Sequence, residues 1–476
     1  MICYKNSLEP QQKAFKINMD PSIYGSFAEI GAGQEVARYF FQAGATAGTV
    51  ARTISAYDMA MSDSLYEDSS NNRYVSQERL IQMLDFEYNF LLEQLDKSRG
   101  ATSSFFTFAN TIAARSYRRG HRCHGWLGVK LQSTPKAVPS RLILHVNLLD
   151  QENVFQQQAV GILGVNLIYA CFYATDLDQS AFLDSLMEGL SSDRIEIDMI
   201  TVSGDAFNNF DDRLLSLELV RKGLTGAVLF DVDGTVMPVA DAIYKKSVLL
   251  LRGGFRPPTK YNFDMLECGL RAFKESLEPH EREEVISLVE ISMSKLFDRD
   301  TEIDYQDFLS RVDLLSLSKQ RVLISGYKDY VSLKEYLAKQ TNKYLGLVMA
   351  TYNIEFLLNE MNHLEGGLGL LGSIGAIFGR RTRAFIYPTV KDELNPDLDD
   401  LITLDTLALS DKLRPLMQYL RDGGLLVDIV DYNPEVVHIW SRIVLELMQA
   451  GESGWEEMVP AEILGYIKKQ RLFMNS

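Results

Sequence analysis

Two aspartates stand two residues apart, directly after an apolar run, in the stretch TGAVLFDVDGTVMP (residues 225–238). Asp231 and Asp233 fall where we expect a strand to end, and Gly234 allows a turn. A carboxylate in this position can attack a phosphoryl group and form an aspartyl-phosphate, while the second acts as general acid and base. Carboxylates also hold Mg²⁺. The spacing therefore predicts phosphoryl transfer, with a solvated strand-end turn as the alternative.

This spelling resembles the nucleophile motif of haloacid-dehalogenase-type (HAD) phosphohydrolases. The resemblance implies that Ser325, after the apolar run RVLI, contacts the phosphate, and that Lys343 supplies a cation. It also implies Asp428 as a third metal ligand beside Asp231 and Asp233. The context agrees only in part, because a complete strand-helix crossover precedes the motif, whereas the nucleophile strand of that family opens its domain.

A second candidate is the loop RGGFRPPTKYN (residues 252–262), which follows another apolar run. It places Arg252, Arg256, Thr259 and Lys260 close together. Two prolines limit its conformations, so less entropy is lost when its cations bind an anion. We expect phosphate or carboxylate binding here, and salt bridges to acidic side chains are the equally simple alternative.

A third candidate, FAEIGAGQEVARYF (residues 27–40), comes near the pattern G-x-G-x-x-A. Gly31 and Gly33 fit, and Val36 takes the last position. Such glycines resemble the loop of nucleotide-binding or methyltransferase folds, where phosphate or adenosine approaches the backbone at a helix N-terminus. The preceding run SIYGSFAEI is only weakly apolar and gives poor strand context. The alternative is a glycine turn that caps a helix.

Composition limits the classes of partner and compartment. The chain has 476 residues, a net charge of −16 and a pI near 5.0, which oppose binding to nucleic acid or to anionic membranes. The four cysteines are dispersed and do not indicate a disulfide framework. The N-terminal segment is not typical of a signal peptide, and the most apolar stretch, residues 160–174, is too short to cross a bilayer. We therefore expect a cytoplasmic protein.

Other familiar sites receive no support. His121, Cys123 and His124 lie close together, but a structural zinc site needs about four ligands. The sequence contains no G-x-S-x-G elbow, no Walker loop and no H-E-x-x-H motif.

The hydrophobic pattern predicts an α/β fold with a largely parallel sheet. Strand-helix-strand units can be read over residues 142–172, 195–232, 321–350 and 383–430. We expect a helical N-terminal region (1–125), a first α/β part (126–260), a helical insertion or cap (261–318), a second α/β part (319–431) and C-terminal helices (432–476).

Several segments, among them FAEIGAGQEVARYFFQAG, HGWLGV, RGGFRPPTKYNFDML and YLGLVMATYNIEFLLNE, resemble a family of uncharacterised bacterial proteins of about this length. The resemblance covers nearly the whole chain and implies a bacterial source. It includes the arginine-proline loop but not the DVDGT spelling. Members carry the labels TonB-dependent receptor and nicotinate- or nicotinamide-nucleotide adenylyltransferase. The sequence has neither an outer-membrane strand series nor an H-x-G-H motif, so it supports neither label.

These observations favour a protein that binds a nucleotide or another small phosphorylated metabolite at the carboxyl ends of its strands. Loops at Ser203, Asp231 and Ser325 would line that pocket. The alternatives are a Mg²⁺-dependent HAD phosphohydrolase and a non-catalytic scaffold whose helical N-terminal region binds a partner.

Overall fold

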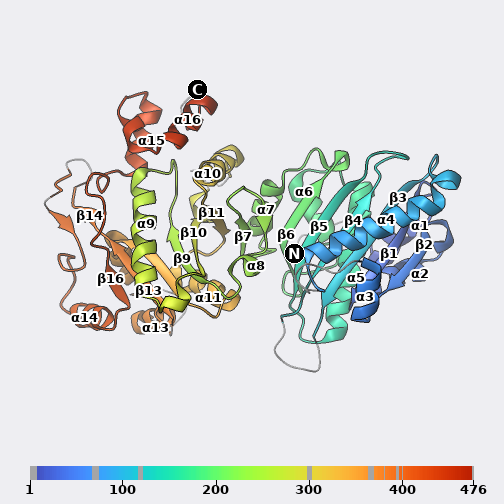
Figure 1. Cartoon of the computed structure of the whole chain (residues 1–476), viewed down its shortest axis with the longest axis horizontal. Coiled ribbons are helices and arrows are strands. Elements are labelled where there is room, and N and C mark those ends of the chain that lie inside the picture. Colours follow the sequence, from blue (N-terminus) through green and yellow to red (C-terminus); the bar gives the residue numbers. More distant parts are fainter. Residues whose placement is uncertain are drawn as a thin grey trace. The chain divides into compact units, whose positions relative to one another are not determined.

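The computed structural model describes residues 8–66, 74–115, 122–296, 303–362, 369–379, 381–392, 396–398 and 400–473 (Figure 1). The chain divides into two compact units, Met1–Thr225 and Gly226–Ser476. Each unit contains a sheet with helices packed against it. The predicted α/β class is confirmed, although the boundary between the units coincides with none of the predicted boundaries.

The first unit is built on a six-stranded sheet of order β2-β1-β3-β4-β5-β6. Its strands are β1 (Ile23–Gly31), β2 (Val50–Ser55), β3 (Ser104–Ala113), β4 (His124–Leu131), β5 (Ser140–Leu148) and β6 (Ile195–Ser203). The three strands β2, β1 and β3 are parallel, and β4, β5 and β6 continue the sheet in antiparallel pairs. The carboxyl ends of parallel strands therefore lie side by side only at β2, β1 and β3 in this sheet.

Helices cover both faces of the first sheet. They are α1 (Pro10–Asn18), α2 (Glu35–Ala43), α3 (Met59–Tyr66), α4 (Gln77–Arg99), α5 (Asn153–Tyr173), α6 (Gln179–Leu186) and α7 (Asp212–Arg221). The main core joins one sheet face to α1, α2, α5 and α6. The long helix α4 packs on the opposite face, where Tyr88 and Leu91 contact Phe105. The segment β1–α2–β2 is a βαβ unit, which places the N-terminus of α2 at the carboxyl end of β1.

Two predictions for this unit were wrong. Residues 1–125 contain the strands β1, β2 and β3 and are not a helical region. Both faces of β1 and β3 are covered, so polar and apolar residues do not alternate along them. The apolar run 164–172, expected as a strand, continues α5, because a helix buried on all sides gives the same continuous pattern.

Helix α5 is long and apolar enough to cross a bilayer by length and composition. However, 67% of its apolar window is buried inside the unit, as is typical of the core helix of a soluble protein. The prediction that this stretch is too short to cross a bilayer considered only residues 160–174, whereas the helix begins earlier, at Asn153.

The second unit is built on an eight-stranded sheet of order β16-β13-β12-β9-β10-β11-β7-β8. Its strands are β7 (Ala227–Phe230), β8 (Val236–Met237), β9 (Ser247–Arg252), β10 (Val285–Ser292), β11 (Arg321–Ser325), β12 (Leu345–Ala350), β13 (Thr382–Tyr387) and β16 (Leu426–Asp428). The six strands from β16 to β11 are parallel, and β7 and β8 extend the sheet in antiparallel pairs. A separate ladder joins β14 (Thr389–Val390) to β15 (Leu401–Ile402).

The second sheet is doubly wound. Helices α8 (Val239–Ile243), α11 (Tyr330–Gln340), α12 (Thr351–Asn362), α13 (Gly369–Ile377) and α14 (Arg414–Asp422) share one core with one face. Helices α9 (Lys260–Glu275) and α10 (Tyr305–Leu317) pack against the sheet outside that core, and α15 (Ser441–Ala450) and α16 (Ala461–Gln470) follow near the end of the chain (Figure 1). The chain passes from β9 to β10 and β11, then returns to β12, β13 and β16 on the other side of β9. The strand order therefore reverses between β9 and β12, where open α/β sheets bind ligands.

Residues 261–318 are not the predicted helical insertion, because β10 lies within them as a central strand. The units predicted over residues 321–350 and 383–430 are confirmed as β11–α11–β12 and β13–α14–β16. The unit over residues 195–232 has the predicted elements, but β6 and β7 belong to different sheets.

Candidate functional site

The DVDGT stretch forms the turn of the β7–β8 hairpin. The N–H of Gly234 donates to the carbonyl oxygen of Asp231, and the N–H of Asp231 donates to that of Thr235, each at 2.8 Å. Gly234 has φ +81°, the left-handed conformation that a three-residue hairpin loop with a glycine bulge requires. Asp233 accepts hydrogen bonds from the Thr235 N–H and hydroxyl at 3.0 and 2.6 Å, and these bonds lower its pKa. Both aspartates, the glycine and the threonine of the motif thus have a role within the turn.

The antiparallel direction of β7 separates Asp231 from Ser325. Phe230 pairs with Val322 and Ala227 pairs with Ser325, so Asp231 lies where β11 begins and Ser325 lies where it ends. At about 3.3 Å per residue, four residues place them about 13 Å apart along the strands. Asp231 instead lies 2.7 Å from Arg321 in an ion pair.

The remaining residues of the predicted phosphohydrolase site are also distant. Asp428 ends β16, six strand positions from β7, which corresponds to about 29 Å at about 4.8 Å per strand. Lys343 precedes β12 and lies 3.6 Å from Glu281. Within the described part of the chain, no three His, Cys, Asp or Glu side chains are placed to hold a metal ion. The structure therefore does not assemble the residues that a HAD site would need.

The arginine-proline loop starts at Arg252, whose guanidinium is held by other residues of the same unit. Its Nε and Nη2 donate to the two carboxylate oxygens of Glu290 at 2.7 and 3.2 Å, and its other donors bond the carbonyl oxygens of Tyr327 and Lys328. Glu290 is fully buried and also accepts a 2.5 Å hydrogen bond from the Ser325 hydroxyl. Arg252 and Ser325 are therefore brought together by one buried carboxylate, and Arg252 is not available to a ligand.

The next residues of this loop lead into α9 at the carboxyl end of β9. Gly254 has open space where a side chain would begin, and the buried Phe255 has φ +48°, a strained conformation for a bulky residue. Thr259 is the N-cap of α9 in a capping box with Asn262. Lys260 is exposed, and in the described part of the chain neither its N–H nor that of Tyr261 has an acceptor. This helix end combines unpaired donors with one cationic side chain, which favours an anion.

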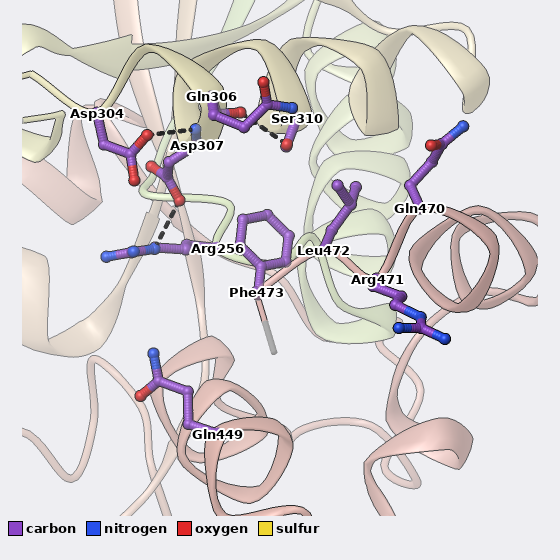
Figure 2. Close-up of a pocket in the computed structure, with 10 residues that line it drawn as sticks. All are labelled: Arg256, Asp304, Gln306, Asp307, Ser310, Gln449, Gln470, Arg471, Leu472 and Phe473. Atoms are coloured by element: carbon purple, nitrogen blue, oxygen red, sulfur yellow. Dashed lines mark hydrogen bonds and ion pairs between the residues drawn. The ribbon is translucent and has the colours of Figure 1, made fainter. Parts of the chain in front are cut away.

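A cavity of about 300 Å³ lies beside the same loop. Figure 2 shows around it Arg256, the α10 N-cap Asp304, Asp307 in the first turn of α10, Gln449 of α15 and the segment from Gln470 to Phe473. The Arg256 Nε lies 2.7 Å from Asp307, which also pairs with Arg311. Burial raises the pKa of Asp307, and the two arginines oppose that shift. Of the described residues, two arginines and two aspartates line the cavity, and their formal charges cancel.

The glycine loop of the first unit follows a true parallel strand, contrary to the weak strand context of its sequence. Gly31 has φ +84°, and a side chain there would begin 2.0 Å from the carbonyl oxygen of Ile112. A side chain at Gly33 would begin 2.0 Å from the amide of Asn110. Both positions therefore require glycine. A cavity of about 300 Å³ opens beside Gly31, Ala32 and Gln34.

Ser203, the last predicted ligand residue, ends β6 and is exposed. It belongs to the first unit, whereas Asp231 and Ser325 belong to the second. Of these three residues, only Ser325 lies at the same strand edge as the arginine-proline loop, and Asp231 lies at the opposite end of β11.

Sequence reasoning missed the polar residues beneath the glycine loop. Glu29 of β1 pairs across the sheet with Ser55 of β2 and Asn110 of β3, so the three side chains form one row. Glu29 and Asn110 are buried, and burial raises the pKa of Glu29 to about 8. A single polar residue inside each apolar run, as in SFAEIG and FANTIA, was the available signal.

A row of hydrogen-bonded side chains that includes two histidines crosses the antiparallel half of the same sheet. The Asp198 carboxylate lies 2.5 Å from Nδ1 of His145, whose Nε2 lies 3.0 Å from Nδ1 of His124. The nearby Arg122 lies 3.4 Å from Asp198 and, with His145, lowers its pKa against the effect of burial. These residues line neither cavity, and His121 falls outside the described residues. We therefore interpret these hydrogen bonds as structural contacts that join β4, β5 and β6.

No family model matches the chain, and no curated protein matches it. Similar solved structures include the competence/damage inducible protein CihA from Agrobacterium tumefaciens, with 17% identity over 35% of this chain and 98% of that chain and a TM-score of 0.26. A competence-damaged protein (CinA) superfamily protein from Klebsiella pneumoniae has 8% identity over 34% and 93%, with a TM-score of 0.26. The Plasmodium falciparum nicotinic acid mononucleotide adenylyltransferase complexed with APC has 10% identity over 48% and 97%, with a TM-score of 0.28. At these values the similarities establish no activity for either unit.

Proposed function

We propose that the second unit binds a nucleotide or another small phosphorylated metabolite at the carboxyl ends of its parallel strands. The observation that carries the proposal is the position of the arginine-proline loop. It follows β9, the strand at which the doubly wound order reverses, and it leads directly into the N-terminus of α9. Ligands of open α/β sheets bind at this reversal, because loops on its two sides diverge and leave a crevice.

The anionic group would bind at the first turn of α9. The N–H groups of Lys260 and Tyr261, which no described residue accepts, and the helix dipole favour negative charge there, and the Lys260 ammonium adds a full positive charge. Arg256 would contact the ligand from the side of the adjacent cavity, because only its Nε faces Asp307 in an ion pair. Open space at Gly254 lets a ligand approach the backbone.

The test compares two lysines of the same helix. Lys260 begins α9, and Lys274 is exposed in its last turn, about 21 Å away at about 1.5 Å per residue. We would measure binding of AMP, ADP and inorganic pyrophosphate by isothermal titration calorimetry, using wild type, Lys260→Ala and Lys274→Ala. Lys260→Ala should weaken binding roughly three- to tenfold at low salt, and less at high salt because exposed charges are screened. Lys274→Ala should bind as wild type does.

Equal affinities for the two variants would contradict the proposal, as would the absence of binding by wild type to any of the three probes. The same titrations test Arg256→Gln, which removes the lateral cation but retains a hydrogen-bond donor. Its effect should be smaller than that of Lys260→Ala, because Asp307 already offsets part of the arginine charge.

A further inference from the structure

The cavity beside the glycine loop of the first unit differs from the one beside Arg256 in its charge. Its lining includes Gly31, Ala32, Gln34, Tyr57, Arg115 and Asn153, and no acidic side chain of the described residues lines it. Within the part of the chain that the structure describes, Arg115 is the one charged residue of the lining, and it forms no ion pair with an acid there. Asn153 opens α5, so the positive ends of α5 and α2 both lie at this cavity. Its electrostatic field therefore favours an anion.

The glycine loop also supplies unpaired backbone donors. The N–H groups of Ala32, Gly33 and Gln34 have no acceptor within the described residues. The Gln34 side chain holds the loop by donating to the Gly31 carbonyl oxygen at 2.6 Å and to the Ser55 hydroxyl at 3.0 Å. Consecutive free N–H groups before a helix are the donors that cradle phosphate in glycine loops.

A buried amide beneath the loop is incompletely satisfied. Asn110 is fully buried, and its Nδ2 donates to the Gly33 carbonyl oxygen at 3.3 Å. Its Oδ1 is buried against Gly33 and receives no hydrogen bond from any described residue. An unsatisfied buried acceptor is costly, and it marks a position directly beneath the loop that an ordered water would complete.

Two carboxyls near the loop, those of Glu29 and Glu35, do not cancel this field. Burial raises the pKa of Glu29 to about 8, so its side chain is mostly uncharged at neutral pH. Glu35, in the first turn of α2, lies 3.0 Å from Arg38 in an ion pair and does not line the cavity.

From the cavity, its unpaired donors and the orphaned amide together, we infer that the first unit holds a second site, which binds the phosphate group of a small phosphorylated molecule. The phosphate contacts the N–H groups of residues 32–34 and the Arg115 guanidinium. The exposed Tyr57 ring borders the cavity and is placed to contact the rest of the ligand. The site is independent of the one at α9, because all its residues belong to the first unit.

The experiment uses the full chain with inorganic phosphate and ribose 5-phosphate as probes, followed by calorimetry and ³¹P NMR. Arg115→Gln should weaken the binding of both probes roughly tenfold, as expected for loss of a charge-assisted hydrogen bond. The matched control is Arg99→Gln, which removes an exposed arginine in the last turn of α4, on the opposite face of the sheet, and should leave affinity unchanged. Gly33→Ala should abolish binding, because the added methyl meets Asn110.

Thermal melting shows whether Gly33→Ala still folds, and the Arg115→Gln result stands if it does not. Lys260→Ala separates the two sites: it should retain the phosphate affinity that Arg115→Gln loses. The inference is overturned if Arg115→Gln binds as wild type does, if Lys260→Ala alone removes binding, or if wild type shows no saturable binding of either probe.

Discussion

The two strand-end loops that could bind anions obtain their positive character in opposite ways. The arginine-proline loop of the second unit is rich in cationic side chains, but Arg252 is held by Glu290 and Arg256 is paired with Asp307. The glycine loop of the first unit, residues 31–34, contains no basic residue, yet among the described residues its N–H groups of positions 32–34 have no acceptor and no acid lines its cavity. Cationic residues in a sequence therefore overstate the charge that a ligand meets, because a fold can neutralise them internally.

The largest effect should come from breaking the ion pair beneath the arginine-proline loop. Arg252→Met leaves the fully buried Glu290 carboxylate without its partner, so we expect a loss of about 3–5 kcal/mol in the free energy of unfolding. The double variant Arg252→Met/Glu290→Leu should recover most of this loss, because no unpaired buried charge remains. Urea unfolding measures both. A stable Arg252→Met protein with weakened AMP binding would instead make Arg252 a ligand residue and remove the contrast between the loops.

The next effect concerns Glu29, beneath the glycine loop. Its pKa of about 8 in the folded protein exceeds its ordinary value near 4.5, so the folded state keeps a proton that the unfolded state loses between these pH values. Its contribution to stability is therefore fully present below about pH 4.5 and decreases as pH rises to about 8. Compared with Glu29→Gln, wild type should lose about 4 kcal/mol across this window, because each pKa unit corresponds to about 1.4 kcal/mol.

Urea unfolding of the two proteins at pH 5 and pH 8.5 measures the difference, and Glu93→Gln, which removes an exposed carboxylate of α4, is the control. Parallel pH curves for wild type and Glu29→Gln would show that Glu29 is ionised beneath the loop. The site would then hold a negative charge, and the contrast with the arginine-proline loop would weaken.

The smallest effect is expected at the DVDGT turn, whose residues line neither of the two cavities. Gly234→Ala forces a side chain into a left-handed turn position and should cost roughly 1–2 kcal/mol. Asp231→Asn breaks only a partly exposed ion pair with Arg321 and should cost under about 1 kcal/mol. Gly254→Ala, in the arginine-proline loop, should leave stability nearly unchanged because its new methyl group meets no atom. Thermal melting of the three variants tests this order.

A loss of phosphatase activity in Asp231→Asn, with stability retained, would contradict the assignment of DVDGT as a turn. Such a result would require Asp231 to act without Ser325 or Asp428, which lie elsewhere on the sheet.

The candidate sites show which sequence signals were reliable. The arginine-proline loop was correctly placed after a strand and before a helix, because the apolar run, the prolines and the Thr259 cap are all local signals. The strand before the glycine loop was underestimated, because Gly25 and Glu29 interrupt a segment that tertiary packing covers on both faces. Gly25 lies so close to Phe106 of β3 that a side chain would begin 2.4 Å from its ring, so the glycine is a packing requirement.

By itself, the sequence determined the α/β class, the strand-helix-strand order over residues 321–350 and 383–430, and the loops that contain the candidate residues. These features follow from local propensity and hydrophobic period. Only the tertiary structure decided that β7 joins its sheet antiparallel, which separates Asp231 from Ser325, and that Glu290 occupies Arg252. It also placed Asn110 of β3 beneath Gly33, across 77 residues of chain. Strand direction, charge pairing and long-range contacts depend on which segments become neighbours, and no local pattern specifies that choice.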